Sequence, residues 1–253
     1  MAFLDPVLNP ILLPLINKSP FLAILIISLV ISVLITFVYK LVTNQEKMKE
    51  MKDKQKDYQK KMKELRSNPE EMMKVQKEAM KINMEYMKQS FKPTLITMLP
   101  IILIFGWMAA HFSYEPIYPG ETYSVTAFFN EGIEGTSQLV IDDGTQFFSE
   151  ESQDIVDKQV TWNLKSDEGP HLLTFKQGKT EQTRKILISK NFNFEDPIET
   201  FEHSDITKAQ INYNKLKPLG DYSIFGWRPG WLGIYIIFSI VFSMVLRKVL
   251  KIY

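Results

Sequence analysis

The sequence has no cysteine and only three histidines among its 253 residues. The absence of cysteine excludes a disulfide framework and Cys-based zinc or iron–sulfur sites. His111, His171 and His203 lack the spacing of metal ligands, and the sequence has no HExxH, GxSxG or Ser-x-x-Lys motif. We therefore predict that the chain is not an enzyme and has no catalytic residue, no metal ligand and no cofactor.

Charge is nearly absent from three blocks of the sequence, although 23% of all residues are charged. These blocks cover residues 21–38, 94–112 and 231–246. About 20 residues at a rise of 1.5 Å each cross a hydrocarbon core of about 30 Å. We predict transmembrane helices within residues 21–43, 93–112 and 229–253, with Pro93 at the start of the second and Pro100 kinking it. Three buried helices of a soluble protein are the weaker alternative.

The residues before the first block differ from a signal peptide. Residues 1–18 contain three prolines and almost no basic residue, and no small-residue cleavage site follows the apolar block. We interpret residues 1–20 as an N-terminal interfacial segment that leads into an uncleaved span.

The distribution of charge predicts the orientation in the membrane. Residues 44–92 contain 14 Lys or Arg against 9 Asp or Glu, whereas residues 113–228 contain 11 against 19. The C-terminal end adds Arg247, Lys248 and Lys251. Because basic residues near span ends mark the cytoplasmic side, we expect the N-terminus and residues 113–228 outside, and residues 44–92 and the C-terminus in the cytoplasm.

Residues 44–92 form a methionine-rich segment that predicts a helical hairpin, or coiled coil. Good helix formers fill its first half, and Ser67-Asn68-Pro69 is typical of a turn followed by a new helix. Heptad spacing connects one set of apolar residues on the second arm: Met73, Met80, Met84, Met87 and Phe91. The first arm offers a matching set: Met48, Met51, Tyr58, Met62 and Leu65.

Two interpretations of these methionines remain open. They form the seam between the two arms, or Met73, Met80, Met84 and Met87 bind hydrophobic client segments. Methionine suits surfaces that accept many apolar shapes, and the surplus of lysine would favour contact with anionic lipid or ribosomal RNA.

Residues 113–228 have the alternating, β-branched and aromatic pattern of a small all-β domain. The regular spacing of its short strands predicts a sandwich. The predicted strands cover residues 122–129, 137–141, 159–164, 171–176 and 183–189. The last two predict a hairpin. Asp142-Asp143-Gly144 is typical of a polar turn, with a calcium loop as the weaker alternative. Residues 191–228 have weaker periodicity, and we expect them to return to the membrane surface.

Hydroxyl side chains recur at helical spacing within the apolar blocks. Ser28, Ser32 and Thr36 share one face of the first helix, and Thr94 and Thr97 open the second. The third helix has a similar series: Tyr235, Ser239, Ser243 and Arg247. Small hydroxyl residues also permit close helix packing, but polar residues in a span normally face protein or water. We predict a hydrophilic groove that is open to the cytoplasm and to lipid. Such a groove would shorten the distance that a polar segment crosses in hydrocarbon without hydration, and the process would need no nucleotide.

Four stretches carry a resemblance to a known family: LDPVLNPILLPL, NPEEMMKVQKEAMK, FKPTLITMLPIILIFGWM and IFGWRPGWLGIYIIFSIVFSMVLRKVLK. With them the sequence resembles the archaeal YidC-like proteins of the Oxa/YidC/Alb insertase superfamily, over residues 3–112 and 215–253. The resemblance implies a membrane protein insertase with three core spans, a cytoplasmic hairpin that engages ribosomes or clients, and a hydrophilic groove. It also implies kinship with insertase subunits of the eukaryotic endoplasmic reticulum.

Two features depart from that family. Bacterial relatives have a groove arginine in their first core span, whereas residues 21–39 contain no Arg or Lys, so a groove charge must come from Lys40 or Arg247. The β-domain lies between the second and third core spans, whereas the large bacterial β-domain precedes the core.

The resulting hypothesis is an insertase and chaperone for nascent or tail-anchored membrane proteins. Its expected partners are these clients and membrane lipids, with the ribosome and a small membrane subunit as further candidates. Two alternatives remain: an oligomeric cation channel lined by the polar stripes, and a membrane tether whose outer domain binds an envelope partner.

Overall fold

The computed structural model describes residues 4–252 and divides into two compact units. The helical unit holds Ser19–Ala110 and Trp231–Tyr253, together with the N-terminal residues up to Leu12. The β-unit holds Leu13–Lys18 and His111–Gly230. Among the described residues, three helices are long and apolar enough to cross a membrane: α2 (Pro20–Val42), α4 (Pro69–Phe112) and α5 (Trp231–Val249).

Short polar caps separate the first three helices. α1 (Asp5–Lys18) ends before Ser19, whose hydroxyl accepts a hydrogen bond of 3.3 Å from the Leu22 N–H and so caps α2. After α2, Asn44 caps α3 (Gln45–Glu64) by accepting a bond of 3.0 Å from the Lys47 N–H. These caps divide an almost continuous helical region into three helices, α1, α2 and α3.

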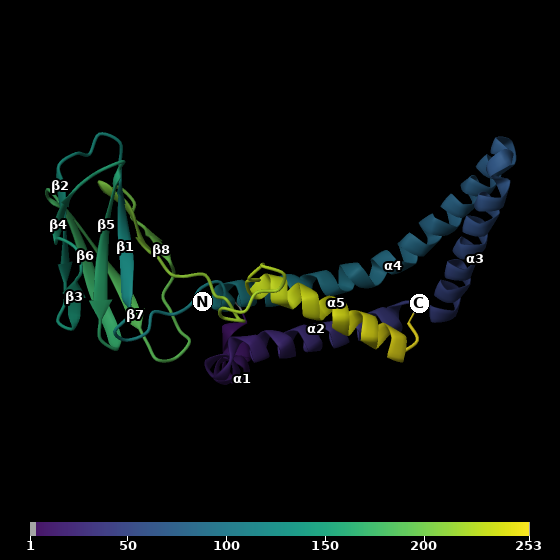
Figure 1. Cartoon of the computed structure of the whole chain (residues 1–253), viewed down its shortest axis with the longest axis horizontal. Helices are drawn as coiled ribbons and strands as arrows, with labels where there is room; N and C mark the ends of the chain where they lie inside the picture. Colours follow the sequence, from purple (N-terminus) through teal and green to yellow (C-terminus); the bar gives the residue numbers. More distant parts are fainter. Residues whose placement is uncertain (1–3, 253) are drawn as a thin grey trace. The chain divides into compact units, whose positions relative to one another are not determined.

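α3 and the first part of α4 form the two arms of a hairpin (Figure 1). The turn between them is η1 (Leu65–Ser67), and Asn68 accepts a bond from the Glu71 N–H at the start of α4. An ion pair of 2.5 Å between Lys47 and Glu85 joins the arms. The predicted hairpin is therefore present in the structure.

α4 continues without a break from the hairpin into the second span over 44 residues. The prediction that Pro93 begins a helix was wrong, because Pro93 and Pro100 both lie inside α4. The Thr94 and Thr97 hydroxyls donate bonds of 3.1 Å to the Ser90 and Pro93 carbonyls. Both hydroxyls thus donate to carbonyls of their own helix, and Figure 1 shows that α4 bends gradually along its length.

α2 and α5 run side by side in the same direction (Figure 1). The Phe21 and Phe238 rings lie 5.6 Å apart near one end, and the Arg247 guanidinium lies 5.0 Å from the Tyr39 ring near the other. α4 runs in the opposite direction, and its Phe105 ring packs 4.7 Å from the Tyr235 ring. This arrangement is the one that three consecutive membrane crossings require.

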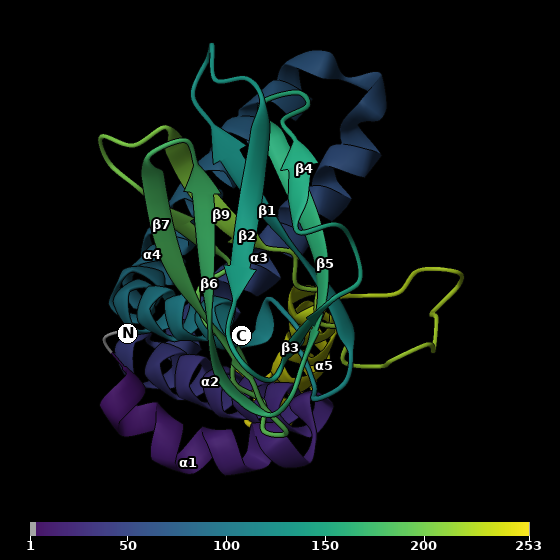
Figure 2. The same ribbon diagram turned by 90° about the vertical axis from the view of Figure 1, so that its left-hand side faces the viewer.

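The β-unit consists of two antiparallel sheets. The first contains β3 (Thr145–Phe147), β5 (Gln159–Ser166), β1 (Thr122–Phe129), β9 (Ile206–Ile211) and β8 (Ile198–Thr200) in spatial order. The second contains β4 (Ser152–Asp154), β2 (Thr136–Ile141), β6 (Gly169–Gln177) and β7 (Thr180–Ile188). The sheets face each other (Figures 1 and 2), and Trp162, Phe175 and Leu139 are fully buried in the core. The predicted fold class, three membrane helices with an inserted all-β sandwich, is confirmed.

The strand predictions were accurate for β1, β2, β5, β6 and β7, including the β6–β7 hairpin. They missed the short strands β3 and β4, and they also missed β8 and β9 in the segment that was expected only to return to the membrane. Ile206, Ala209 and Ile211 of β9 are buried, and β9 pairs with the central strand β1. The register shifts between Phe128 and Phe129 of β1, so β9 lacks the simple alternation from which strands are predicted.

Candidate functional site

The hydroxyl face of α2 is turned toward protein. Ser28, Ser32 and Thr36 are all buried, and the Ser28 hydroxyl donates a bond of 2.7 Å to the Ile24 carbonyl of its own helix. The opposite face exposes large apolar side chains such as Val30 and Phe37. Because lipid solvates apolar side chains, we interpret the exposed face as the lipid-facing one. The predicted hydroxyl stripe therefore faces the interior of the helical unit.

The polar stripe of α5 becomes more exposed along the helix. Tyr235 is buried against Phe105, whereas Ser239 and Ser243 are half-buried and Arg247 is exposed. The Ser239 hydroxyl oxygen is inaccessible and has no hydrogen-bond partner among the described residues. Burying a hydroxyl without a hydrogen-bond partner costs free energy and is unusual. Packing between helices alone therefore does not explain a serine at position 239.

A pocket of about 310 Å³ lies where the spans meet the hairpin. We call it the hydroxyl pocket and define it by its lining residues: Ile35, Tyr39, Tyr86, Ser90, Pro93, Thr94, Thr97 and Arg247. Three residues predicted for the groove, Thr94, Thr97 and Arg247, therefore lie in one cavity. Ser28, Ser32, Thr36, Tyr235, Ser239 and Ser243 do not line it.

The sequence prediction missed Tyr39, Tyr86 and Ser90, which extend the polar stripes into the pocket. Tyr39 lies three residues after Thr36, and Ser90 lies four residues before Thr94. The Tyr39 and Ser90 hydroxyls are 3.4 Å apart and connect α2 with α4. Continuation of the same helical spacing past the apolar blocks would have found these residues.

The C-terminal tail packs against Tyr39, one of the residues that line this pocket. Ile252 is buried in a cluster with Tyr39, Met48 and Met51, which lie on α2 and α3. The Ile252 N–H donates a bond of 2.9 Å to the Arg247 carbonyl, which closes the turn after α5. The guanidinium of Arg247 lies 5.0 Å from the centre of the Tyr39 ring, so the tail contacts the residues that line the pocket.

The hairpin separates its apolar residues into two sets. Met48 and Met51 of α3 are buried, as a seam position requires. On α4 the seam consists of residues with reduced exposure at heptad spacing: Met72, Val75, Ala79, Ile82 and Tyr86. Met73, Met80, Met84 and Met87 are 56–67% exposed, so the interpretation that these four form the seam was wrong.

The exposed methionines belong to a stripe that continues into the second span. We call it the α4 stripe; its members are exposed and recur at helical spacing: Met73, Met80, Met84, Met87, Phe91, Leu95, Met98 and Ile102. A shallow concavity of about 740 Å³ lies along Met80 and Met84, and its other lining residues are polar: Lys77, Lys81, Glu85, Lys88 and Gln89. An apolar surface with a mostly basic rim thus leads from the hairpin into the membrane span.

Together, the α4 stripe and the hydroxyl pocket provide two chemically different surfaces along α4, and α2 and α5 complete the pocket. Flexible methionines can accept an apolar helix of variable shape. The hydroxyl groups and the single guanidinium of the pocket can hydrogen-bond polar groups that leave water. The arrangement is suited to a segment that contains an apolar stretch beside a polar one.

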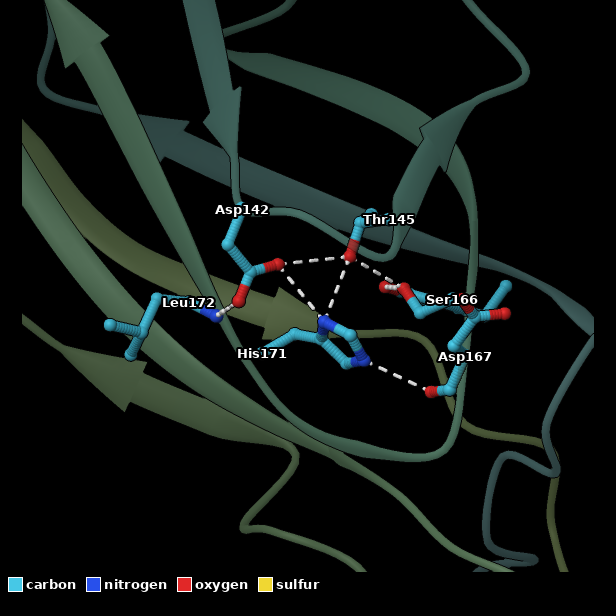
Figure 3. Close-up of polar contacts among 7 residues, drawn as sticks. Asp142, Thr145, Ser166, Asp167, His171 and Leu172 are labelled. Atoms are coloured by element: carbon cyan, nitrogen blue, oxygen red, sulfur yellow. Dashed lines mark hydrogen bonds and ion pairs between the residues drawn. The ribbon is translucent and has the colours of Figure 1, made fainter.

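A different polar cluster lies inside the β-unit, between the two sheets (Figure 3). His171 Nδ1 is 3.0 Å from Asp142 Oδ1 and 3.2 Å from Thr145 Oγ1, and its Nε2 is 2.9 Å from the Asp167 carbonyl oxygen. The other Asp142 oxygen accepts a bond of 2.9 Å from the Leu172 N–H. A nucleophile–histidine–acid triad places the nucleophile and the acid on opposite ring nitrogens, whereas Thr145 and Asp142 share Nδ1 here.

These contacts stabilise the ionised form of Asp142. Burial by itself would raise the pKa of the carboxyl, but the bonds from Leu172, His171 and Thr145 outweigh it and lower the pKa below its ordinary value. The Asp142 carboxylate accepts its hydrogen bonds from donors within the β-unit, as expected of a polar turn. We interpret the cluster as a structural connection between the β2–β3 turn and β6.

Comparison with known proteins gives one match. A family model described as integral membrane protein EMC3/TMCO1-like matches residues 2–129. The match covers half of the chain and includes α1 to α4, hence the whole hairpin and every residue of the hydroxyl pocket except Arg247. No curated protein and no solved structure matches the chain.

Proposed function

Because the chain belongs to the EMC3/TMCO1-like family of integral membrane proteins, an Oxa1/YidC-related family of insertase type, we propose that it inserts membrane proteins into the bilayer without a nucleotide. The observation that carries the proposal is the α4 stripe, which is exposed on the hairpin and continues into a span beside the hydroxyl pocket. The resemblance of the motifs further supports a place among the archaeal YidC-like proteins.

The first step is the capture of the apolar client segment on the α4 stripe. Each exposed methionine leaves apolar area in water until a client covers it, and burial yields about 25 cal/mol per Å². Met80 and Met84 line the concavity, Met87 continues the exposed stripe, and these three are the main client contacts on the hairpin. The lysines along its rim favour acidic client flanks or the anionic lipid surface.

The second step is the passage of the polar flank. A polar group that enters hydrocarbon without a partner costs several kcal/mol. Thr94, Thr97 and Arg247 offer hydrogen bonds at the point where the flank leaves water. The free energy of partition of the apolar segment into lipid drives the reaction, so no cofactor participates.

This mechanism places the hairpin and the C-terminus in the cytoplasm and the β-unit outside. The opposite charge surpluses of residues 44–92 and 113–228 support that orientation. Nascent and tail-anchored membrane proteins are the proposed clients. The ribosome, which would meet the basic hairpin, and a small membrane subunit are the further proposed partners.

Reconstitution tests the proposal. Purified protein in liposomes is mixed, without nucleotide, with a client that has one weakly hydrophobic segment and a short polar tail. We expect protease protection of the tail to exceed that in empty liposomes. Equal protection in both would contradict insertion.

The same vesicles distinguish the channel alternative. Ser28, Ser32 and Thr36 are buried within the chain, so they are not free to line a pore between copies. We expect no potassium flux above that of empty vesicles, whereas flux without client insertion would favour a channel.

A further inference from the structure

A loop of the β-unit displays four large apolar side chains just before α5. We call residues 221–228 the aromatic loop. Phe225 is 106% exposed and Tyr222 is 81% exposed, and Trp227 and Ile224 are exposed as well. Isolated exposed apolar residues are common on protein surfaces, but a contiguous group of this kind marks an interaction site.

The loop is closed by its own hydrogen bonds. Ile224 and Trp227 exchange backbone bonds of 2.8 Å and 3.0 Å across a two-residue turn. At the base, Arg228 Nη1 lies 3.3 Å from Asp221 Oδ1. The tip therefore has a defined conformation that presents Phe225 outward.

The conformation at the tip is unfavourable for the residue that occupies it. Phe225 has φ +51° and Gly226 has φ +81°. Glycine adopts this left-handed region freely, and asparagine does so with little cost, whereas a bulky aromatic residue does not. An aromatic side chain held in strained backbone and fully exposed is a combination that indicates a binding role rather than a folding role.

Chain length limits how far this loop can be from the membrane. α5 has 19 residues and is about 28 Å long, close to the hydrocarbon thickness of about 30 Å. Its first residue, Trp231, therefore lies near one interface, and Arg247 near the other. Trp227 is four residues before Trp231, so it is at most about 14 Å away along an extended chain.

We propose that the aromatic loop inserts into the interface of the lipid bilayer and anchors the start of α5. Tyr and Trp carry an apolar ring with a polar group and are enriched at this depth, between headgroups and acyl chains. Arg228 lies at the base of the loop, where its guanidinium can also meet lipid phosphate. The bound ligand is thus the glycerophospholipid interface, and the proposal does not depend on insertase activity.

Depth measurements on the full-length protein in phospholipid nanodiscs test the proposal. Because the chain has no cysteine, a single Phe225→Cys or Ser223→Cys variant can carry one nitroxide label without background. We expect the labels at 225 and 223 to collide more with oxygen than with a water-soluble nickel chelate. The control, Lys179→Cys at the β6–β7 turn, should show the opposite preference.

Water-like accessibility at position 225 in nanodiscs would overturn the proposal and would leave a protein partner as the occupant. A second variant removes the aromatic groups while the turn is retained: Phe225→Asn with Trp227→Ser, labelled at Ser223→Cys. Asparagine tolerates positive φ, so the loop should keep its turn. We expect at least a threefold rise in collisions with the chelate, and unchanged immersion would also overturn the proposal.

Discussion

Asp142 connects two parts of the β-unit through one carboxylate. It accepts bonds from His171, Thr145 and the Leu172 N–H, and these bonds lower its pKa although burial acts in the opposite direction. A carboxyl whose pKa is lowered by folding stabilises the fold above its unfolded pKa of about 4, and this contribution is lost as the pH falls through the folded pKa.

We therefore expect Asp142→Asn to lower the free energy of unfolding of the β-unit by about 1 kcal/mol at pH 7. The value is at the low end because the side chain is 35% exposed. The difference between variant and parent should shrink below about pH 4. Thermal unfolding followed by circular dichroism measures it, with the exposed neighbour Asp143→Asn as the control. Equal effects of both substitutions would contradict the role of the cluster.

Thr97 tests the hydroxyl pocket at a single position. Thr97→Val keeps the shape of the side chain and removes the hydroxyl. If that hydroxyl gives a translocating polar flank one hydrogen bond of about 1 kcal/mol, insertion of a client with a polar tail should slow about fivefold. A purely apolar client should be unaffected.

The matched control is Ser28→Ala. Its hydroxyl donates to its own helix as that of Thr97 does, but Ser28 does not line the pocket. Insertion by this variant should remain unchanged. A loss of similar size for both substitutions would indicate a general packing effect instead of pocket chemistry.

On the second arm of the hairpin, the sequence alone could not predict which residues form the seam with α3. Two sets of residues on α4 have heptad spacing, one containing Met73 and Met80 and the other containing Val75 and Ile82. Spacing identifies a stripe but does not decide which stripe meets α3. The structure selects the set that includes the small Ala79 as the seam, since a small side chain permits close approach of the two arms.

The other elements follow the same physical logic. Apolar length alone identified α2 and α5, and alternation identified β1 and β6. β9 was not predicted because its pairing with β1 includes a register shift. The continuity of α4 was not predicted because Pro93 normally indicates a helix start. In the pocket, Thr94 and Thr97 were predictable from the helix face. Tyr39 and Ser90 continue the same helical spacing but lie outside the apolar blocks to which the search for hydroxyl stripes was confined.

At the scale of the element, the two methionine sets should respond differently to substitution. Met80, Met84 and Met87 are exposed, so replacing all three by Gln should leave the hairpin folded, because Gln is a good helix former. Client capture should fall at least tenfold. Met48→Gln with Met51→Gln places amides in the seam and should destabilise the hairpin by about 2–4 kcal/mol per site.

Limited proteolysis reports hairpin folding, and co-purification of a stalled client reports capture. Client capture that survives the triple substitution would remove the α4 stripe from the mechanism.

At the scale of the whole molecule, the opposite charge surpluses of the two large segments predict their sides of the membrane. Since the chain has no cysteine, single-cysteine variants at Arg66 in the hairpin turn and Lys179 in the β6–β7 turn can be labelled selectively. In intact cells, we expect an impermeant maleimide to label position 179 alone. Labelling of position 66 without lysis would reverse the proposed orientation.

The most direct test of the central claim is site-specific photo-crosslinking to a ribosome-bound client. Probes replace Met84 on the α4 stripe and Thr97 in the hydroxyl pocket, and matched controls replace the exposed neighbour Asn83 and the lipid-facing Val30. The account predicts client adducts at 84 first and at 97 as the chain lengthens, with few adducts at 83 and 30. Equal adducts at all four positions, or none at 84 and 97, would contradict it.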